Sequence, residues 1–352
     1  MAIDDMFGNP ATGEVFGKDD LEVKEYLGKA LVEDLWNLRA TQVYEARRLA
    51  QAGGRGVKVA IIDTGINYNH PQLKGSCSPI RGINLSGGSE NDFMDTDGHG
   101  TFVAGIIAGR DFGIAPEAEI YAVRISKEGI GDPNTLRDAI YWCINNKIDI
   151  ASISSGTPRY REDIRSACVR ANKRGLIIVA AAGNNSTGAF FPASYDREVI
   201  SVGAVDSAYK HCIFSNIWPT TDLVAPGKRI FSAHSNKKGE EKYMLSDGTS
   251  AAAPHITGIL ALGLSLLKRE AKEIEQQRLE EILKDTTLSY LKRQRKKEAF
   301  SLTDVYSQKY DPRKRYIKRN KATIEAIYGV GLVQAKDFIK GLMKIAKIKR
   351  KA

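Results

Sequence analysis

The sequence predicts an α/β fold of three layers (α/β/α), with a mostly parallel central sheet between two layers of helices. Two observations lead to this prediction. Short, nearly continuous apolar runs recur along the chain, and amphipathic helical patterns alternate with them. Strands of a parallel sheet are buried on both faces and therefore appear as apolar runs, while the connecting helices cover the faces. Functional residues of such sheets gather where the strands end.

Five strands are expected, in order along the chain. The first is a β-branched run that ends on an acid, VKVAIID at 57–63. The other four apolar runs lie at 118–125, 148–154, 175–183 and 199–205. Helical patterns separate them at 99–109, 133–146 and 161–174. This alternation predicts parallel strands joined by helical crossovers.

The composition is that of an ordinary globular chain, with 352 residues, 42% hydrophobic and 27% charged. No apolar run approaches the eighteen or so residues that a membrane helix needs, so no membrane span is expected. The acidic, polar start does not resemble a secretory signal. The cysteines form no CxxC pair, so neither a zinc site nor a disulfide framework is expected, and a cytoplasmic location is favoured. They are Cys77, Cys143, Cys168 and Cys212.

The positive charge of the chain is concentrated in its C-terminal part. The net charge is +10, but residues 286–352 contain 19 Lys and Arg against 5 Asp and Glu. The preceding 285 residues are therefore slightly acidic, with a net charge of −4. The excess of basic residues therefore needs an explanation that is specific to the C-terminal part.

Three short blocks contain residues suited to nucleophilic catalysis. DTGI leaves Asp63 at the end of the first strand, HGTFVAG begins with His99, and GTSAAAPH contains Ser250. The order Asp, His, Ser is one of the known orders of a serine-protease triad. In these blocks and their order, the chain resembles the subtilisin-like serine proteases (subtilases, peptidase family S8) from about Leu35 to Leu342. Alone, Asp63 would be a turn residue and Ser250 a helix cap, but the three blocks together favour catalysis.

The resemblance implies a role for each residue. His99 would take the proton of Ser250 and later give it to the leaving amine, while Asp63 would orient the imidazole. Asn184, in the block AAGN, corresponds to the asparagine that donates to the oxyanion, together with the Ser250 N–H. The activity implied is that of a serine endopeptidase acting on proteins or peptides.

The resemblance also implies a substrate cleft. Ser154, Ser155 and Gly156 would pair with the peptide as an added strand, and Gly129, in KEGIG, would belong to the opposite edge. Phe190 occupies the position where the family usually has a small residue at the floor of the S1 pocket. A filled floor predicts small or medium P1 side chains.

The chain departs from secreted subtilases at their tight calcium site. Gln72 stands at the position of an acidic ligand, in HPQL, and the helix after His99 is expected to run directly through 105–120 without the calcium-binding loop. Since Ca²⁺ needs about six to eight oxygen ligands, carboxylates among them, the tight site is expected to be absent. No cofactor is expected to be required, although a weak Ca²⁺ or Na⁺ site near Asp206 stays open.

Three regions flank or interrupt the expected catalytic domain, which spans 35–342. Residues 1–34 form an N-terminal extension or short pro-segment, too short for the folding pro-domain of secreted relatives. Either it is a frayed terminus, or it lies over the cleft and limits activity until it is cut. Residues 343–352 are a basic tail.

The basic insertion at about 289–322 is the third region. It is a solvated surface segment or a docking patch for an acidic partner or nucleic acid. The second interpretation gives the alternative function, a partner- or nucleic-acid-binding protein on a protease scaffold. A helix-hairpin-helix that binds DNA was one interpretation of 324–342, but the family's closing segment, YGVGLVQA at 328–335, explains those residues better.

Overall fold

The computed structural model describes residues 13–31, 33–127, 130–289 and 324–349, and its main feature is a seven-stranded sheet. The strand order is β10-β9-β8-β7-β2-β4-β3, and every neighbouring pair is parallel. The strands are β2 (Lys58–Asp63), β3 (Cys77–Asn84), β4 (Glu119–Arg124), β7 (Ile150–Ile153), β8 (Ile177–Ala181), β9 (Ile200–Val205) and β10 (Leu223–Pro226). The five expected strands are confirmed, whereas β3 and β10 were not foreseen.

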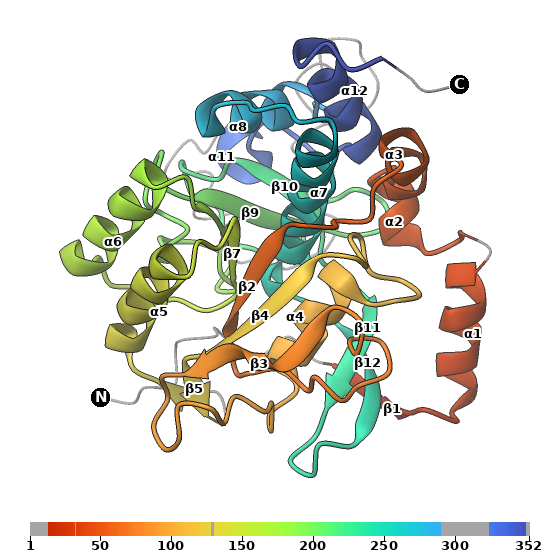
Figure 1. Ribbon diagram of the computed structural model, residues 1–352, viewed down its shortest axis with the longest axis vertical. Helices are drawn as coiled ribbons and strands as arrows, with labels where there is room; N and C mark the ends of the chain where they lie inside the picture. Colours follow the sequence, from red (N-terminus) through yellow and green to blue (C-terminus); the bar gives the residue numbers. More distant parts are fainter. Residues whose placement is uncertain (1–12, 32, 128–129, 290–323, 350–352) are drawn as a thin grey trace.

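Helices cover both faces of this sheet (Figure 1). On one face lie α5 (Pro133–Asn145) and α6 (Glu162–Lys173), and on the other α4 (His99–Ala108) and α7 (Thr249–Arg269). Strand β2 shows how the sequence separates the two cores. Val59 and Ile61 belong to the cluster under α4 and α7, and Ala60 and Ile62 to the cluster under α5 and α6, since successive side chains point to opposite faces. The three-layer α/β/α prediction is confirmed.

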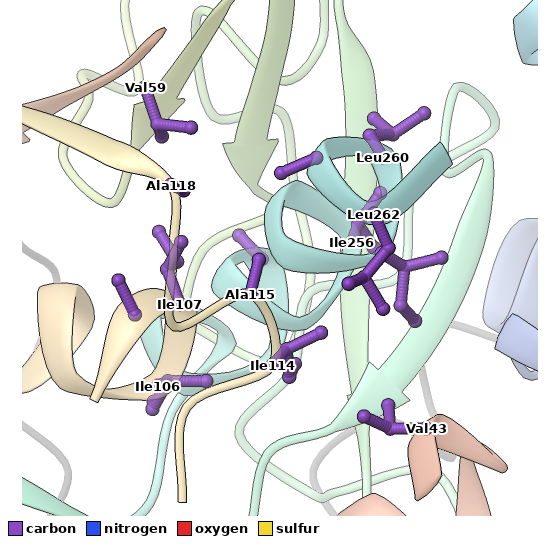
Figure 2. Packing of buried hydrophobic residues seen from close by; sticks show 14 of the residues in the cluster. Val43, Val59, Ile106, Ile107, Ile114, Ala115, Ala118, Ile256, Leu260 and Leu262 are labelled. Atoms are coloured by element: carbon purple, nitrogen blue, oxygen red, sulfur yellow. The ribbon is translucent and has the colours of Figure 1, made fainter. Parts of the chain in front are cut away.

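Helix α7 is the centre of the larger core. Figure 2 shows its residues Ile256, Leu260 and Leu262 in the same buried cluster as Ile107 of α4 and Val59 of β2. Among the described residues, α7 is the one helix long and apolar enough to cross a membrane, with a mean hydropathy of 1.5. Of that apolar stretch, 89% is buried inside the fold, so its composition is that of a core helix.

Residues 13–31 are built into the body of the protein. Strand β1 (Glu14–Gly17) pairs antiparallel with β12 (Glu241–Ser246), which pairs with β11 (Ile230–Ser235). In α1 (Leu21–Leu31), Val23 is fully buried and Tyr26 stacks on Phe231 of β11, with ring centroids 4.8 Å apart. This segment is therefore not a frayed terminus.

Short helices and one small hairpin complete the described elements, among which α3 and α12 pack together. They are α2 (Trp36–Ala40), α3 (Val43–Ala50), β5 (Ser126–Lys127), β6 (Ile130–Gly131), α8 (Gln276–Asp285), α11 (Ile324–Tyr328) and α12 (Ala335–Ile345).

The closing segment 328–335 lies against the edge of the main sheet. Val333 N donates to Val224 O, Val224 N donates to Gly331 O, and Leu332 is fully buried. These contacts make the segment part of the fold, as the family interpretation expected. The basic insertion lies outside the described residues except for Ser289, so its docking role stays untested.

We predict that Val23→Ala lowers the free energy of unfolding by about 1–3 kcal/mol, because it removes buried apolar surface between α1 and the body. The matched control is Leu21→Ala on the same helix, since Leu21 is 78% exposed and its loss should cost less than about 0.5 kcal/mol. Urea unfolding in a Ser250→Ala background, which prevents self-digestion, measures both. Equal effects would contradict the packing of α1 on the body.

Candidate active site

Four of the residues singled out from the sequence lie where strands end and helices begin. Asp63 is the last residue of β2, and Asn184 follows three residues after β8. His99 is the first residue of α4 and Ser250 the second of α7. Strand β7 separates β2 from β8 in the sheet, and helices α4 and α7 cover the same face of it. The topology therefore collects the four residues at one edge.

The structure joins Asp63 and His99 directly. His99 Nδ1 donates to Asp63 Oδ1 at 2.7 Å, and the Thr64 N–H donates to the same oxygen at 2.8 Å. Asp63 is fully buried, and among the described residues its Oδ2 has no hydrogen-bond partner. Because Nδ1 carries the proton of this bond, Nε2 of a neutral His99 carries no proton. The ring is thus set up as a base on its Nε2 side.

Three carboxylates act on the charge of His99. Burial by itself lowers the pKa of His99, but Asp63, followed by Asp97 and Asp95, raises it to about 9 from the usual 6.5. Since 26% of the side chain is exposed, water screens part of this field. The imidazolium is therefore stabilised in this site.

Glycine allows α4 to approach β2 this closely. A Cβ on Gly100 would lie 2.1 Å from the backbone oxygen of Gly65 and 3.2 Å from Asp63 Cβ. Only a residue without a side chain fits between the first turn of α4 and the turn after β2. The approach brings His99 within hydrogen-bond distance of Asp63.

The side-chain amide of Asn184 has a defined orientation. Its Oδ1 accepts from both the N–H and the Oγ1–H of Thr249, each at 2.9 Å. The Nδ2 donors are thereby directed away from Thr249. A Cβ placed on Gly248, whose φ is 151°, would lie 2.8 Å from Ser250 Oγ and 3.6 Å from both Asn184 Nδ2 and Ser250 N. The nucleophile and the two expected oxyanion donors thus surround one small space.

The expected substrate edge follows β7. Ser154, Ser155 and Gly156 are buried, and Ser154 Oγ donates to Ser250 O at 3.4 Å. Within the described part of the chain, their backbone groups make no backbone hydrogen bond, which leaves them open to an added strand. Gly129, expected on the opposite edge, lies outside the described residues, between β5 and β6.

Phe190 fills the space beside this edge. Its side chain is 2% exposed. Ring atoms of Phe190 would lie 2.7 and 3.1 Å from a Cβ placed on Gly156, and its Cβ and Cγ 3.0 Å from one placed on Gly183. The phenyl group therefore occupies the room between two glycine backbones.

One expectation about the calcium region is wrong. The helix after His99 does not run through 105–120, because α4 ends at Ala108. A short loop follows, and Ile114 N donates across it to Ile106 O at 3.0 Å. Gly113 N donates to Gly109 O, so the loop folds back on itself and rejoins the end of α4.

Gln72 holds this loop with its own side chain. Gln72 Nε2 donates to Asp111 Oδ2 at 2.7 Å, and Asp111 N donates to Gln72 Oε1 at 3.0 Å. The carboxylate of Asp111 also binds the Arg110 guanidinium, which, with Gln72, lowers its pKa. The side-chain oxygens of Gln72 and Asp111 thus all have hydrogen-bond partners on the protein.

Other metal sites have little support in the described residues. No group of three or more His, Cys, Asp or Glu side chains there could hold a metal ion. Asp206 Oδ1 accepts from the N–H groups of Ala208 and Lys210, at 2.9 and 3.0 Å, and so closes a turn. All four cysteines are free and buried.

The sequence did not reveal two residues that support the candidate site. Thr249 orients the Asn184 amide, and Asp95 is a fully buried carboxylate behind the turn after Asp63. The run DTDGHG (95–100) contains a signal, since an acid just before a helix can cap it, but no local pattern predicts burial of Asp95.

Comparisons with known proteins agree with this geometry. The model of the subtilase family (peptidase S8) matches residues 54–331. The major intracellular serine protease of Bacillus subtilis (strain 168) is 39% identical over 244 residues, which are 65% of this chain and 73% of that protein. The intracellular serine protease of Paenibacillus polymyxa is 39% identical over 227 residues, 60% of this chain and 68% of that protein. A solved cold-adapted subtilisin-like serine proteinase is 30% identical, with a TM-score of 0.61, over 68% of this chain and 85% of its own.

We predict that a chelator leaves the melting temperature of this protein nearly unchanged, because hydrogen bonds of Gln72 replace a tight ion in the 109–113 loop. Gln72→Ala should instead destabilise the chain by about 1–3 kcal/mol, since it leaves buried polar groups of the loop without partners. Thermal unfolding with and without EDTA, for both proteins with Ser250→Ala, measures this. A sharp fall in melting temperature on adding EDTA would show that a tight ion is present.

Proposed function

Because the chain belongs to the subtilase family of serine endopeptidases, we propose that it hydrolyses peptide bonds of proteins through an acyl-enzyme on Ser250. Asp63, His99 and Ser250 form the triad in this proposal, and Asn184 is the side-chain donor of the oxyanion hole. The main support is the 2.7 Å bond from His99 Nδ1 to Asp63, which keeps the proton of a neutral ring on Nδ1 and makes Nε2 its basic nitrogen.

Acylation begins when Ser250 Oγ attacks the carbonyl carbon of the scissile bond. As the C–O bond forms, the hydroxyl proton passes to His99 Nε2, and Asp63 stabilises the resulting imidazolium. The oxyanion receives hydrogen bonds from Asn184 Nδ2 and the Ser250 N–H, which also lies at the positive end of α7. The C–N bond then breaks, and the proton on Nε2 leaves with the amine.

Deacylation repeats these steps with water. His99 Nε2 removes a proton from the water as its oxygen attacks the ester carbon, and the same donors bind the oxyanion. When the ester C–O bond breaks, Nε2 returns the proton to Ser250 Oγ and the carboxylic acid product leaves. Protein groups supply every proton transfer and charge contact, so we propose that no cofactor is required.

The test is a fluorophosphonate probe followed by a casein digest, each with the wild type and Ser250→Ala. We expect labelling and cleavage in the wild type and neither in the variant, because the nucleophilic oxygen is gone. Equal labelling of both proteins would place the reactive group elsewhere. Labelling without casein cleavage would restrict the activity to selected peptides.

We also propose that Phe190 limits the P1 residue to small or medium side chains. Its phenyl group fills the space between Gly156 and Gly183, where the family resemblance puts the S1 pocket. A large P1 side chain would have to displace a buried aromatic ring.

Phe190→Gly should therefore shift the preference towards large P1 residues. We expect the ratio of kcat/KM for P1 Phe to that for P1 Ala to rise by roughly tenfold or more, because a pocket of new volume opens. Peptide p-nitroanilides with Ala, Leu and Phe at P1 measure the ratio, and Phe190→Leu should give an intermediate value. An unchanged ratio would exclude Phe190 from the S1 pocket.

We place the enzyme in the cytoplasm as a further proposal. The two relatives compared above are named as intracellular proteases. The four cysteines of this chain are free and buried, as a reducing compartment allows.

The hypothesis that the N-terminal extension limits activity now concerns residues 1–12 alone. Residues 13–31 pack on the body through β1 and α1. Glu14 pairs with Leu245 near the end of β12, and the chain continues from that end through Gly248 to Ser250. The chain before Glu14 therefore begins near the end of β12 that leads to Ser250. This position supports the proposal that residues 1–12 reach the cleft.

Deleting residues 1–12 should raise the rate of fluorophosphonate labelling, since the cleft would lose its cover, and should leave the melting temperature unchanged. Labelling rates of the uncleaved chain and the truncated chain, with N-terminal sequencing of both, measure this. Equal rates with an intact N-terminus would refute the cover.

A further inference from the structure

Asp95 lies at the centre of a hydrogen-bond cluster next to the triad. Its carboxylate is fully buried and accepts five hydrogen bonds. Oδ1 accepts from Thr64 Oγ1 at 3.0 Å, from Asp97 N at 3.0 Å and from Gly98 N at 2.8 Å. Oδ2 accepts from Thr101 N at 2.9 Å and from Thr101 Oγ1 at 2.6 Å. Each carboxylate oxygen of Asp95 thus accepts at least two hydrogen bonds.

These donors come from two segments that carry triad residues. Thr64 directly follows Asp63, while Gly98 precedes His99 and Thr101 belongs to the same helical turn. Thr64 Oγ1 also accepts from Gly100 N at 2.9 Å, so the hydroxyl bridges α4 and Asp95. The Asp95 carboxylate therefore ties the turn after β2 to the first turn of α4.

The link matters because Asp63 has few other restraints. Its Oδ2 has no hydrogen-bond partner in the described part of the chain, and Oδ1 is held by Thr64 N and His99. A shift of Thr64 would therefore change the direction from which Asp63 meets the imidazole.

The loop that contains Asp95 is itself held from the sheet. Arg124, the last residue of β4 and the register partner of Asp63, is 4% exposed and donates to Met94 O at 3.0 Å and Thr96 Oγ1 at 3.3 Å. Arg124 thus holds both sequence neighbours of Asp95, Met94 and Thr96.

Charge gives Asp95 a second effect. His99 is the first residue of α4, where the positive end of the helix dipole disfavours an imidazolium. A carboxylate that accepts from Gly98 N and Thr101 N lies at that same end and offsets it.

We propose that Asp95 is a positioning residue of this protease: its buried carboxylate fixes Asp63 relative to His99 and offsets the positive end of α4 beside the imidazolium. The proposal rests on the triad function given above. It adds a carboxylate that touches neither substrate nor His99 but sets the geometry and charge of the base.

The charged groups around His99 come from three elements. Asp63 ends β2, Asp97 and Asp95 precede α4, and His234 extends from β11. Burial lowers the pKa of His234, which favours the neutral form of this imidazole. Of the carboxylates, Asp63 bonds the ring directly and the other two act from the loop.

The experiment compares Asp95→Asn with the wild type in the full chain. The substitution keeps the size of the side chain and removes its charge. It also replaces one acceptor oxygen with an NH₂ group, which then faces N–H donors. We expect kcat to fall by roughly ten- to a hundredfold with KM changed less than about threefold, because the base acts in the transition state. The acid limb of kcat/KM should move to lower pH by roughly half a unit to one unit.

Asp149→Asn is the matched control. Asp149 also accepts a backbone N–H, from Lys58 at the opposite end of β2, and binds Lys268 at 2.7 Å. Its loss should lower the melting temperature and leave the pH profile unchanged. If a folded Asp95→Asn protein keeps the wild-type kcat and the wild-type acid limb of kcat/KM, the proposal is overturned.

Two further measurements keep the proposal testable if Asp95→Asn does not fold or the chain is inactive. Thr64→Val breaks the bridge without removing charge, so kcat should fall with no shift of the acid limb, and Thr64→Ser should restore it. An unchanged kcat in Thr64→Val would overturn the positioning role. An NMR titration of the His99 imidazole in Ser250→Ala, with and without Asp95→Asn, reads the charge effect without catalysis, and identical pKa values would overturn that part.

Discussion

The active site depends on the burial of one helix. Helix α7 is apolar on almost all sides and fills the core under the sheet, so its position is set by packing over its whole length. Its first turn consequently lies at the carboxyl edge of β8 and β9, which it contacts. Ser250 is in that turn, and Thr249 binds the Asn184 amide that follows β8. The proposed nucleophile and oxyanion donor are thus positioned by core packing rather than by a loop.

The base is positioned by a different constraint, a close backbone approach. Gly100 lets α4 lie against the turn after β2, and Asp95 holds the two segments together through hydrogen bonds. A buried carboxylate is costly unless each oxygen has donors, and here two helix N–H groups and two hydroxyls are among them. The positive end of α4 and the negative charge of Asp95 stabilise each other, which leaves the imidazolium of His99 in a favourable field.

Side-chain contacts stabilise the region around the β11–β12 hairpin. Phe231 lies between the rings of Tyr26 and Tyr243, stacked on both, so α1 is joined to the hairpin by an aromatic column. Gln72 binds the loop after α4 from the neighbouring turn. Strand β1 and helix α1 of the N-terminal segment therefore belong to the body of the protein.

The sequence by itself determined the parallel sheet and the chemistry of its edge. Apolar runs such as 57–63 and 175–183 predict strands buried on both faces. The blocks around Asp63, His99 and Ser250 indicate the serine-protease family and the residues proposed to react. Strands β3 and β10 were missed because their patterns are short or irregular, with a bulge in β3. The helical pattern at 99–109 matches α4, but the loop after it was missed because the apolar pattern continues from Ile107 to Ile114.

Only the tertiary structure decided how these residues support one another. The burial of Asp95, the orientation of Asn184 by Thr249 and the contact of Phe190 with two glycines all join segments far apart in sequence. Local pattern reports the periodicity of a strand or helix, but it contains no information on which distant donor meets a given carboxylate. That pairing follows from the packing of whole elements, and here it determines the geometry of the base.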